Sequence, residues 1–242
     1  MDSFMDSLAS GNKEQLAELE ATIGYRFTDL RLLQKAMIHS SFAFEQAQTG
    51  QDNQVFEFIG DAVLDLVIGH MLSRRHPEMK EGDLTRFRAS LVNETHLALM
   101  ARDLELGKFL CLGKGEDNSN GRNKSSILSC AFEAVVGAIF EDSDYQTVEA
   151  LVKRLFKTSV EEKKEDLHLT DAKSRLQELL QDKHNETPTY RLDGEEGPSH
   201  CKRFSVSVLF RDEVLGTGRA GSKKEAEQRA AAAALDNQDN EG

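Results

Sequence analysis

Residues 55–72 read VFEFIGDAVLDLVIGHML, and residues 126–141 read SILSCAFEAVVGAIFE. Both stretches are apolar nearly all round, which is typical of a helix that is buried on every side. Apolar residues recur at three- and four-residue steps through most of residues 13–160. The three prolines stand at positions 77, 188 and 198, so none interrupts these helices. The sequence therefore predicts an all-α domain with two buried helices at its centre.

Three carboxylates lie inside these two predicted helices. Glu57 and Asp61 are four residues apart and share one helix face, and Glu133 lies midway along the second helix. A carboxylate in an apolar helix is costly, on the order of several kcal/mol, unless a partner compensates its charge. Neither helix offers a basic residue three or four positions away. Two interpretations stay open: ion pairs with another element, or a cluster that binds a hard divalent cation such as Mg²⁺.

The last third of the chain has a different pattern. Residues 203–210 (RFSVSVLF) alternate strictly between the two faces of a half-buried strand. Strands are also predicted over 189–192 and 214–220, with a turn at Asp212–Glu213 before the last one.

Two helices flank these strands. An amphipathic helix over 172–181 is predicted to begin at an N-cap, Thr170 or Asp171, and to face inward with Leu176, Leu179 and Leu180. A final helix over 223–235 follows Ser222, which suits an N-cap. The order α-β-β-β-α predicts a small α+β domain after the all-α domain.

Charge is distributed unevenly along the chain. The formal net charge of −12 argues, taken alone, against a polyanionic partner. Residues 172–235 nevertheless hold 11 basic and 10 acidic residues, so the acidic excess lies elsewhere. Residues 161–171 (EEKKEDLHLTD) are polar and charged, and we interpret them as a linker between a domain over 13–160 and a second over 172–237. The same run could instead extend a helix from the preceding segment.

Several classes of protein are excluded by pattern. No run of about 18 apolar residues occurs, so no membrane span is expected. Residues 1–15 lack the basic and apolar regions of a secretory signal. Cys111, Cys130 and Cys201 are far apart and show no zinc spacing. We therefore expect a cytoplasmic protein in a reducing environment.

Three polar or basic features gather in the α+β domain. Lys223 and Lys224 begin the final helix, where side-chain charge and the helix dipole both attract phosphate. Residues 197–200 (GPSH) form a tight loop with His200 at its tip, and Gln177 and Glu178 lie on the exposed side of the first helix. Each feature alone is ordinary for a solvated surface, but their grouping in one domain indicates a polyanion-binding module.

The two domains resemble those of a known family. NQVFEFIGDAVL at 53–64 is similar to the signature of the ribonuclease III family, and GPSH with GSKKEAEQRAA at 221–231 resembles a double-stranded RNA-binding domain. The resemblance covers roughly residues 14–235. Further matching motifs are IHSSF at 38–42, EGDLTRFRASLVNE at 81–94, LGKGE at 112–116, GRNKSSIL at 121–128 and AFEAVVGAIFED at 131–142.

The resemblance implies an all-α endonuclease domain followed by a small α+β (αβββα) double-stranded RNA-binding domain. It implies a homodimer through the nuclease domains and a Mg²⁺-dependent endoribonuclease, with Mn²⁺ as a substitute metal. The products would carry 5′-phosphate and 3′-hydroxyl ends with two-nucleotide 3′ overhangs. Processing of ribosomal RNA precursors, messenger RNA and transfer RNA would be its role.

The resemblance also carries roles over to single residues. It implies that Glu57, Asp61 and Glu133 form the metal centre, that Asp61 orients or deprotonates a water, and that Asp61 and Glu133 are indispensable. Gln54 stands where the family often has Glu and would affect dimer contacts or the choice of cleavage site. The implied RNA contacts are Gln177, Glu178, Gly197, Pro198 and His200 in two minor grooves, and Lys223 and Lys224 on the phosphates between them.

Cys130 is the departure from the family pattern. The family usually has Asp three residues before the glutamate, and a thiol is a poor ligand for Mg²⁺. A water could replace the lost ligand, the metal preference could shift toward softer ions such as Mn²⁺, or catalysis could be weakened. We favour the first, because the other three carboxylates remain. The third would leave a catalytically weakened double-stranded RNA-binding protein, which is the alternative function.

Overall fold

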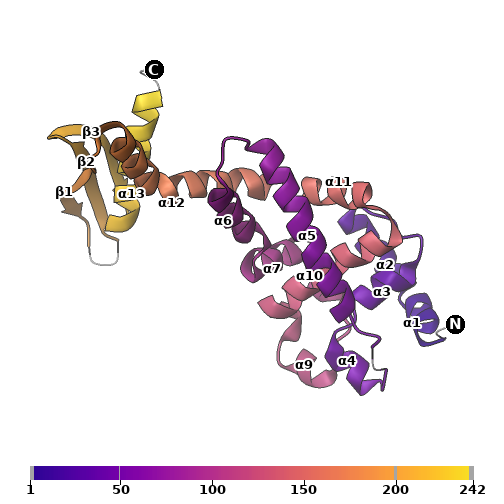
Figure 1. Ribbon diagram of the computed structural model, residues 1–242. Helices are drawn as coiled ribbons and strands as arrows, with labels where there is room; N and C mark the ends of the chain where they lie inside the picture. The colour runs from indigo at the N-terminus through magenta and orange to yellow at the C-terminus, as the bar shows by residue number, and fades with distance from the viewer. Residues whose placement is uncertain (1–2, 49, 199–200, 240–242) are drawn as a thin grey trace. The chain divides into compact units, whose positions relative to one another are not determined.

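The chain folds into two compact units, Met1–Val160 and Glu161–Gly242. The computed structural model describes residues 3–48, 50–198 and 201–239 (Figure 1). None of the helices in these ranges combines the length and apolar character that a membrane span requires.

Helices are the regular elements of the first unit in its described residues, apart from a single β-bridge between Ile38 and Cys111, which confirms the predicted all-α class. Its helices are α1 (Ser3–Gly11), α2 (Lys13–Ile23), α3 (Leu30–Ala36), α4 (Ser40–Glu45), α5 (Gln54–Arg75), α6 (Glu81–Val92), α7 (Glu94–Asp103), α8 (Leu106–Phe109), α9 (Lys114–Asn118), a 3-10 turn (Gly121–Asn123), α10 (Ser125–Asp142) and α11 (Tyr145–Leu155).

Helices α5 and α10 form the centre of this unit (Figure 1). They cross with their backbones in contact at two glycines. A Cβ atom on Gly60 of α5 would overlap the carbonyl oxygen of Glu133, and one on Gly137 of α10 would overlap that of Phe56. Because only glycine permits this approach, the two helices are locked in one register relative to each other.

The prediction that α5 is buried on every side is wrong. Val55, Phe58 and Leu66 are 58%, 77% and 59% exposed, and Ala62 between them is exposed as well. These four residues follow one another at helical spacing, so they form a continuous apolar stripe along the outer face of α5. We call this set the α5 stripe.

The second unit contains a three-stranded antiparallel sheet of order β1-β2-β3 (Figure 1). Helix α13 (Lys223–Asp239) packs on β2 and β3, and the end of α12 (Lys157–His184) completes the core. The strands are β1 (Thr189–Glu196), β2 (Arg203–Phe210) and β3 (Glu213–Ala220). This arrangement confirms the predicted α-β-β-β-α order.

The hairpin turn and the end of the first strand differ from the prediction. The turn between β2 and β3 is Arg211–Asp212, not Asp212–Glu213, and both turn residues have positive φ (49° and 71°). Two such residues are what a two-residue type I′ hairpin needs, since its twist matches that of the strands. Strand β1 also continues to Glu196, four residues beyond the predicted end.

The predicted N-cap at Thr170 or Asp171 is also wrong, because α12 begins at Lys157 and runs through residues 161–171. The run of charges therefore extends a helix, which was the other interpretation of this segment. Its role as a linker stays a prediction. Further along α12, Leu176 and Leu180 are buried and Leu179 is half-buried, as predicted.

Candidate metal centre and nucleic-acid interface

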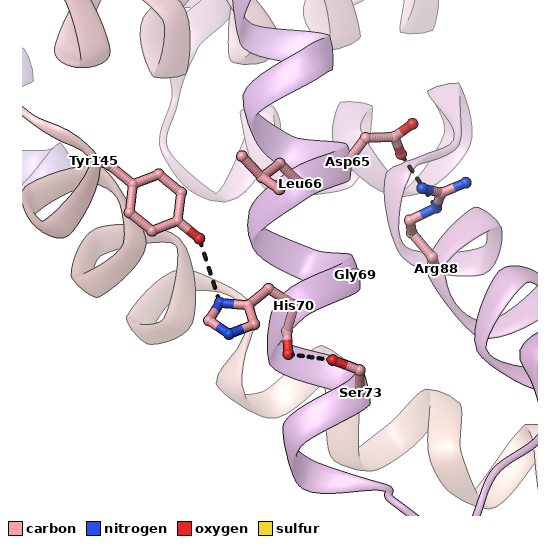
Figure 2. A pocket seen from close by; sticks show the side chains of 7 residues that line it. All are labelled: Asp65, Leu66, Gly69, His70, Ser73, Arg88 and Tyr145. Carbon is pink, nitrogen blue, oxygen red and sulfur yellow. Dashed lines mark hydrogen bonds and ion pairs between the residues drawn. The ribbon is translucent and has the colours of Figure 1, made fainter.

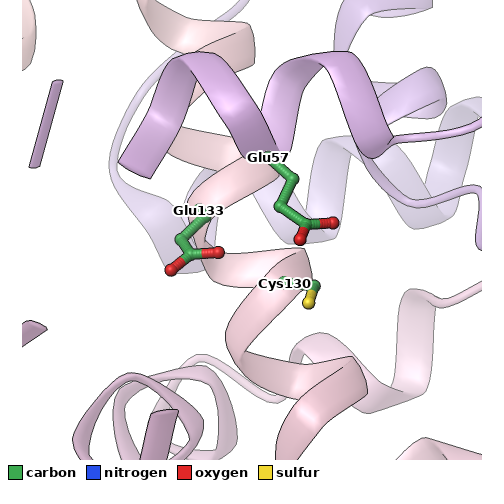
Figure 3. Close-up of side chains that lie close together, drawn as sticks. All are labelled: Glu57, Cys130 and Glu133. Atoms are coloured by element: carbon green, nitrogen blue, oxygen red, sulfur yellow. The ribbon is translucent and has the colours of Figure 1, made fainter. Parts of the chain in front are cut away.

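The crossing of α5 and α10 brings three predicted site residues together. Glu57 extends from α5 toward Cys130 and Glu133 of α10 (Figure 3), and one ligand atom of each lies within 4.8 Å of the other two. All three side chains are half-buried. Asp61 lies one turn further along α5 and is exposed, outside this set of three. The backbone contact between Gly60 and Glu133 explains why Glu57 and Glu133, 76 positions apart in sequence, come close together.

No described basic side chain offsets the charge of Glu133. Burial and, to a smaller extent, the charges of Asp61 and Glu57 together raise the pKa of Glu133 to about 7, and no basic side chain contributes to the shift. The ion-pair interpretation therefore finds no partner for Glu133 among the described residues. A carboxylate pair in this state fits a divalent cation, whose charge would favour the ionised forms.

Cys130 is a neutral thiol in this arrangement. Burial, then a hydrogen bond to Glu57 and the charges of Glu57 and Glu133, together raise its pKa to about 12. A protonated thiol is no ligand for a hard cation. The oxygen donors available to such a cation are thus Glu57 and Glu133, with Asp61 beside them.

Gln54 is the first residue of α5 and is exposed. Its backbone N–H donates to Asp52 Oδ1 at 3.2 Å. It precedes Val55 and so lies beside the α5 stripe, three residues from Glu57.

A surface pocket lies further along α5, and none of the residues that line it belongs to the candidate metal centre (Figure 2). Asp65 on α5 pairs with Arg88 of α6 at 3.4 Å on one side, and the Tyr145 hydroxyl of α11 lies 3.5 Å from His70 Nδ1 on the other. The pocket includes Leu66 of the α5 stripe, so it opens on the same outer face of the helix.

The candidate RNA contacts belong to the second unit. Gln177 and Glu178 are exposed on α12, and Lys223 and Lys224 are exposed in the first turn of α13. The predicted N-cap of α13 is confirmed, because the Ser222 hydroxyl accepts the backbone N–H of Glu225 at 3.2 Å.

The loop after β1 is described in part. Gly197 has a φ of +94°, a conformation that favours glycine, and Pro198 follows it. His200, the predicted tip of this loop, lies outside the described residues. The geometry of the predicted minor-groove contact is therefore known only up to Pro198.

Sequence reasoning missed the α5 stripe, and it also missed Phe44 of α4, which is 86% exposed. The signal was the all-round apolar character of residues 55–72, since one face of such a helix can be covered by another chain instead of by its own domain. Nothing in the pattern distinguished this case from complete burial.

Comparisons with known proteins agree with both units. Residues 29–159 match the family model described as Ribonuclease-III-like, and residues 172–238 match the double-stranded RNA binding motif. A protein named Ribonuclease 3 from Desulfotalea psychrophila is 70% identical over 224 residues, 93% of each chain. Another from Nitratiruptor is 42% identical, over 92% of this chain and 96% of that one.

A solved structure agrees as well. The nuclease domain of ribonuclease III from Campylobacter jejuni is 40% identical, with a TM-score of 0.55, and covers 58% of this chain and 95% of that domain. Together with the helical unit and the αβββα unit, these matches confirm the resemblance inferred from the signature at 53–64. The chain belongs to the ribonuclease III family.

Proposed function

We propose that the protein is an endonuclease that hydrolyses phosphodiester bonds of double-stranded RNA with Mg²⁺ held by Glu57, Asp61 and Glu133. The observation that carries the proposal is the carboxylate cluster at the α5–α10 crossing, whose charge no described cation offsets. Membership of the ribonuclease III family and the double-stranded RNA binding motif supply the substrate class. The products would have 5′-phosphate and 3′-hydroxyl ends with two-nucleotide 3′ overhangs, and precursors of ribosomal, messenger and transfer RNA are the proposed substrates.

The three carboxylates would have different roles. Glu57 and Glu133 are half-buried and close together, so they would hold the metal between the two helices. Asp61 is exposed on the same helix face as Glu57 and would orient the attacking water or accept its proton. A bound Mg²⁺ supplies a lowered pKa for that water and charge stabilisation at the phosphate.

The direct test is incubation of a uniform RNA duplex with and without Mg²⁺. We expect cleavage only with the metal, and end analysis should give two-nucleotide 3′ overhangs. Duplex binding without cleavage at any concentration of Mg²⁺ or Mn²⁺ would instead support the catalytically weakened RNA-binding protein. Cys130 is the observation that favours this second function.

Replacing Cys130 by Asp is expected to lower the Mg²⁺ concentration that gives half-maximal cleavage. The substitution returns an oxygen donor to a position beside Glu57 and Glu133, where the thiol cannot serve a hard cation. Cys130→Ser controls for loss of the thiol without gain of a carboxylate. The idea is abandoned if the Mg²⁺ titrations of wild type and Cys130→Asp coincide.

The double variant Lys223→Ala/Lys224→Ala is expected to bind duplex RNA more weakly, equally across sequences, with a flatter salt dependence. Both lysines are exposed at the N-terminus of α13, so each would contribute one phosphate contact and about one unit to the slope of log K against log salt. The matched control is the other adjacent pair, Lys163→Ala/Lys164→Ala. Equal slopes for the two double variants would count against the phosphate role.

We further propose a homodimer that pairs through the α5 stripe, next to the metal centre. Three large apolar side chains more than half exposed on one helix face are unusual for an isolated domain. In this arrangement Gln54, at the end of the stripe, would contact the partner or the nearby RNA and so affect dimer contacts or the choice of cleavage site.

Phe58→Glu is expected to convert the dimer to a monomer in sedimentation equilibrium, since it places a charge in the middle of the apolar stripe. Leu99→Glu is the control, because Leu99 is 51% exposed on α7 and does not belong to the stripe. A Phe58→Glu protein that still sediments as a dimer would refute this interface.

A further inference from the structure

The metal centre has an unusual set of donors for a hard cation. The ligand atoms that lie within 4.8 Å of one another are one oxygen of Glu57, one oxygen of Glu133 and the Cys130 sulfur (Figure 3). Asp61, the third carboxylate of the centre, is outside this set. The closest three-donor arrangement in the described residues therefore contains a thiol as a full member.

The geometry of these donors is set by backbone packing. Glu57 and Glu133 stand on helices whose approach is fixed at Gly60 and Gly137, and Cys130 is one turn before Glu133 on α10. The three donors thus come from two rigid helices and need only side-chain rotation to converge further. A site of this kind is organised before any ion arrives.

The chemistry of the set matches four-coordinate, thiophilic ions. Zn²⁺ binds Cys sulfur at about 2.3 Å and carboxylate oxygen at about 2.0–2.2 Å, and open zinc sites use three protein ligands and one water. Tetrahedral coordination at these lengths separates donors by about 3.5 Å. The three donor atoms lie within 4.8 Å of one another, so binding one ion would require the side chains to rotate toward it.

We propose that Cys130 makes this centre a binding site for a thiophilic divalent cation of the Zn²⁺ class, held by Cys130 Sγ and one oxygen each of Glu57 and Glu133. Binding replaces the S–H bond by a sulfur–metal bond and releases one proton to solvent. The inference rests on the proposed function, because the same two glutamates would hold Mg²⁺. The two cations compete for them, so a Zn²⁺-class ion is an inhibitor of Mg²⁺-supported cleavage.

Cd²⁺ is the spectroscopic probe, since its bond to a thiolate gives an ultraviolet charge-transfer band. We expect wild-type protein, free of RNA and Mg²⁺, to develop this band with saturation at one Cd²⁺ per chain. Cys130→Ser should abolish the band, and Cys201→Ser should leave it unchanged, because Cys201 is an exposed cysteine outside the cluster. Glu133→Gln should weaken Cd²⁺ binding at least tenfold.

A band that persists in Cys130→Ser, or its absence in the wild type, overturns the proposal. Excess Mg²⁺ is expected to shift the Cd²⁺ titration of the wild type to higher concentration; an unshifted titration overturns the shared site. Zn²⁺ should inhibit Mg²⁺-supported cleavage at a concentration at least tenfold lower in the wild type than in Cys130→Asp, and equal inhibition of the two proteins also overturns it.

These readouts separate the two proposals. The Cd²⁺ band needs neither RNA nor catalysis, and the cleavage test with Mg²⁺ alone needs no thiophilic ion. A chain that binds Cd²⁺ through Cys130 but cleaves no duplex refutes the proposed nuclease function only. A chain that cleaves duplex RNA but gives no Cys130-dependent band refutes the cation inference only.

Discussion

Glu133→Gln is expected to reduce the rate of duplex RNA cleavage by about three orders of magnitude or more, a loss of about 4 kcal/mol of transition-state stabilisation. The amide keeps the shape of the side chain but removes the charge that would hold the metal between α5 and α10. The fold should survive, because burial and repulsion from Glu57 and Asp61 already disfavour the ionised carboxylate. Single-turnover cleavage under saturating Mg²⁺ measures the effect.

Two measurements make this prediction specific. Duplex binding by Glu133→Gln should remain within a few-fold of wild type, since the lysines of α13 are untouched. Glu149→Gln is the matched control, because Glu149 is also a partly buried glutamate of the first unit but pairs with Lys153 at 3.1 Å on α11. Cleavage by Glu133→Gln within tenfold of wild type would remove this residue from the catalytic centre.

Gly137→Ala is expected to destabilise the first unit by about 3 kcal/mol and to lower its melting temperature by about 6–12 °C. The new Cβ would occupy the space of the Phe56 carbonyl oxygen, so α5 and α10 must separate. Overpacking of this kind has no flexible side chain to relieve it, because both sides of the contact are backbone. Gly60→Ala should act in the same way through the Glu133 carbonyl.

The matched control is Gly115→Ala in α9, where a Cβ would meet nothing within 4 Å. This variant should melt at or slightly above the wild-type temperature, since alanine favours helix over glycine. Circular dichroism during heating checks both variants. If Gly137→Ala melts like Gly115→Ala, the direct backbone contact between α5 and α10 does not exist.

The helical class and the αβββα order could be predicted because their patterns are local. Helix α5 begins one residue before the predicted stretch and ends three after it, and β2 has the predicted bounds. The hairpin turn was misplaced by one residue, since Arg211 carries no mark of the positive φ that it adopts. The start of α12 upstream of residue 172 could not be decided from the sequence, because the charged run at 161–171 has no apolar stripe that distinguishes a helix from a linker.

The candidate site could be predicted only in part. Carboxylates in apolar helices pointed to Glu57, Asp61 and Glu133 from the sequence alone, but the approach of Glu57 to Glu133 depends on tertiary contacts. Tertiary contacts also decide the role of Asp142, which the sequence did not reveal. Its carboxylate accepts hydrogen bonds from the Tyr25 hydroxyl at 2.7 Å and from the backbone N–H groups of Thr28 and Asp29. The exposed face of α5 was mispredicted because apolar composition does not say which chain covers a helix.

The glycine contacts between α5 and α10 also determine how freely this centre can be altered. Its frame is made of main-chain atoms, whereas the proposed ion ligands are side-chain atoms, among them the thiol at position 130. In the proposed centre, architecture and ion preference would therefore be encoded separately. A substitution of a donor at position 130 would change which ion the centre accepts, while the glycine contacts keep the two helices in place.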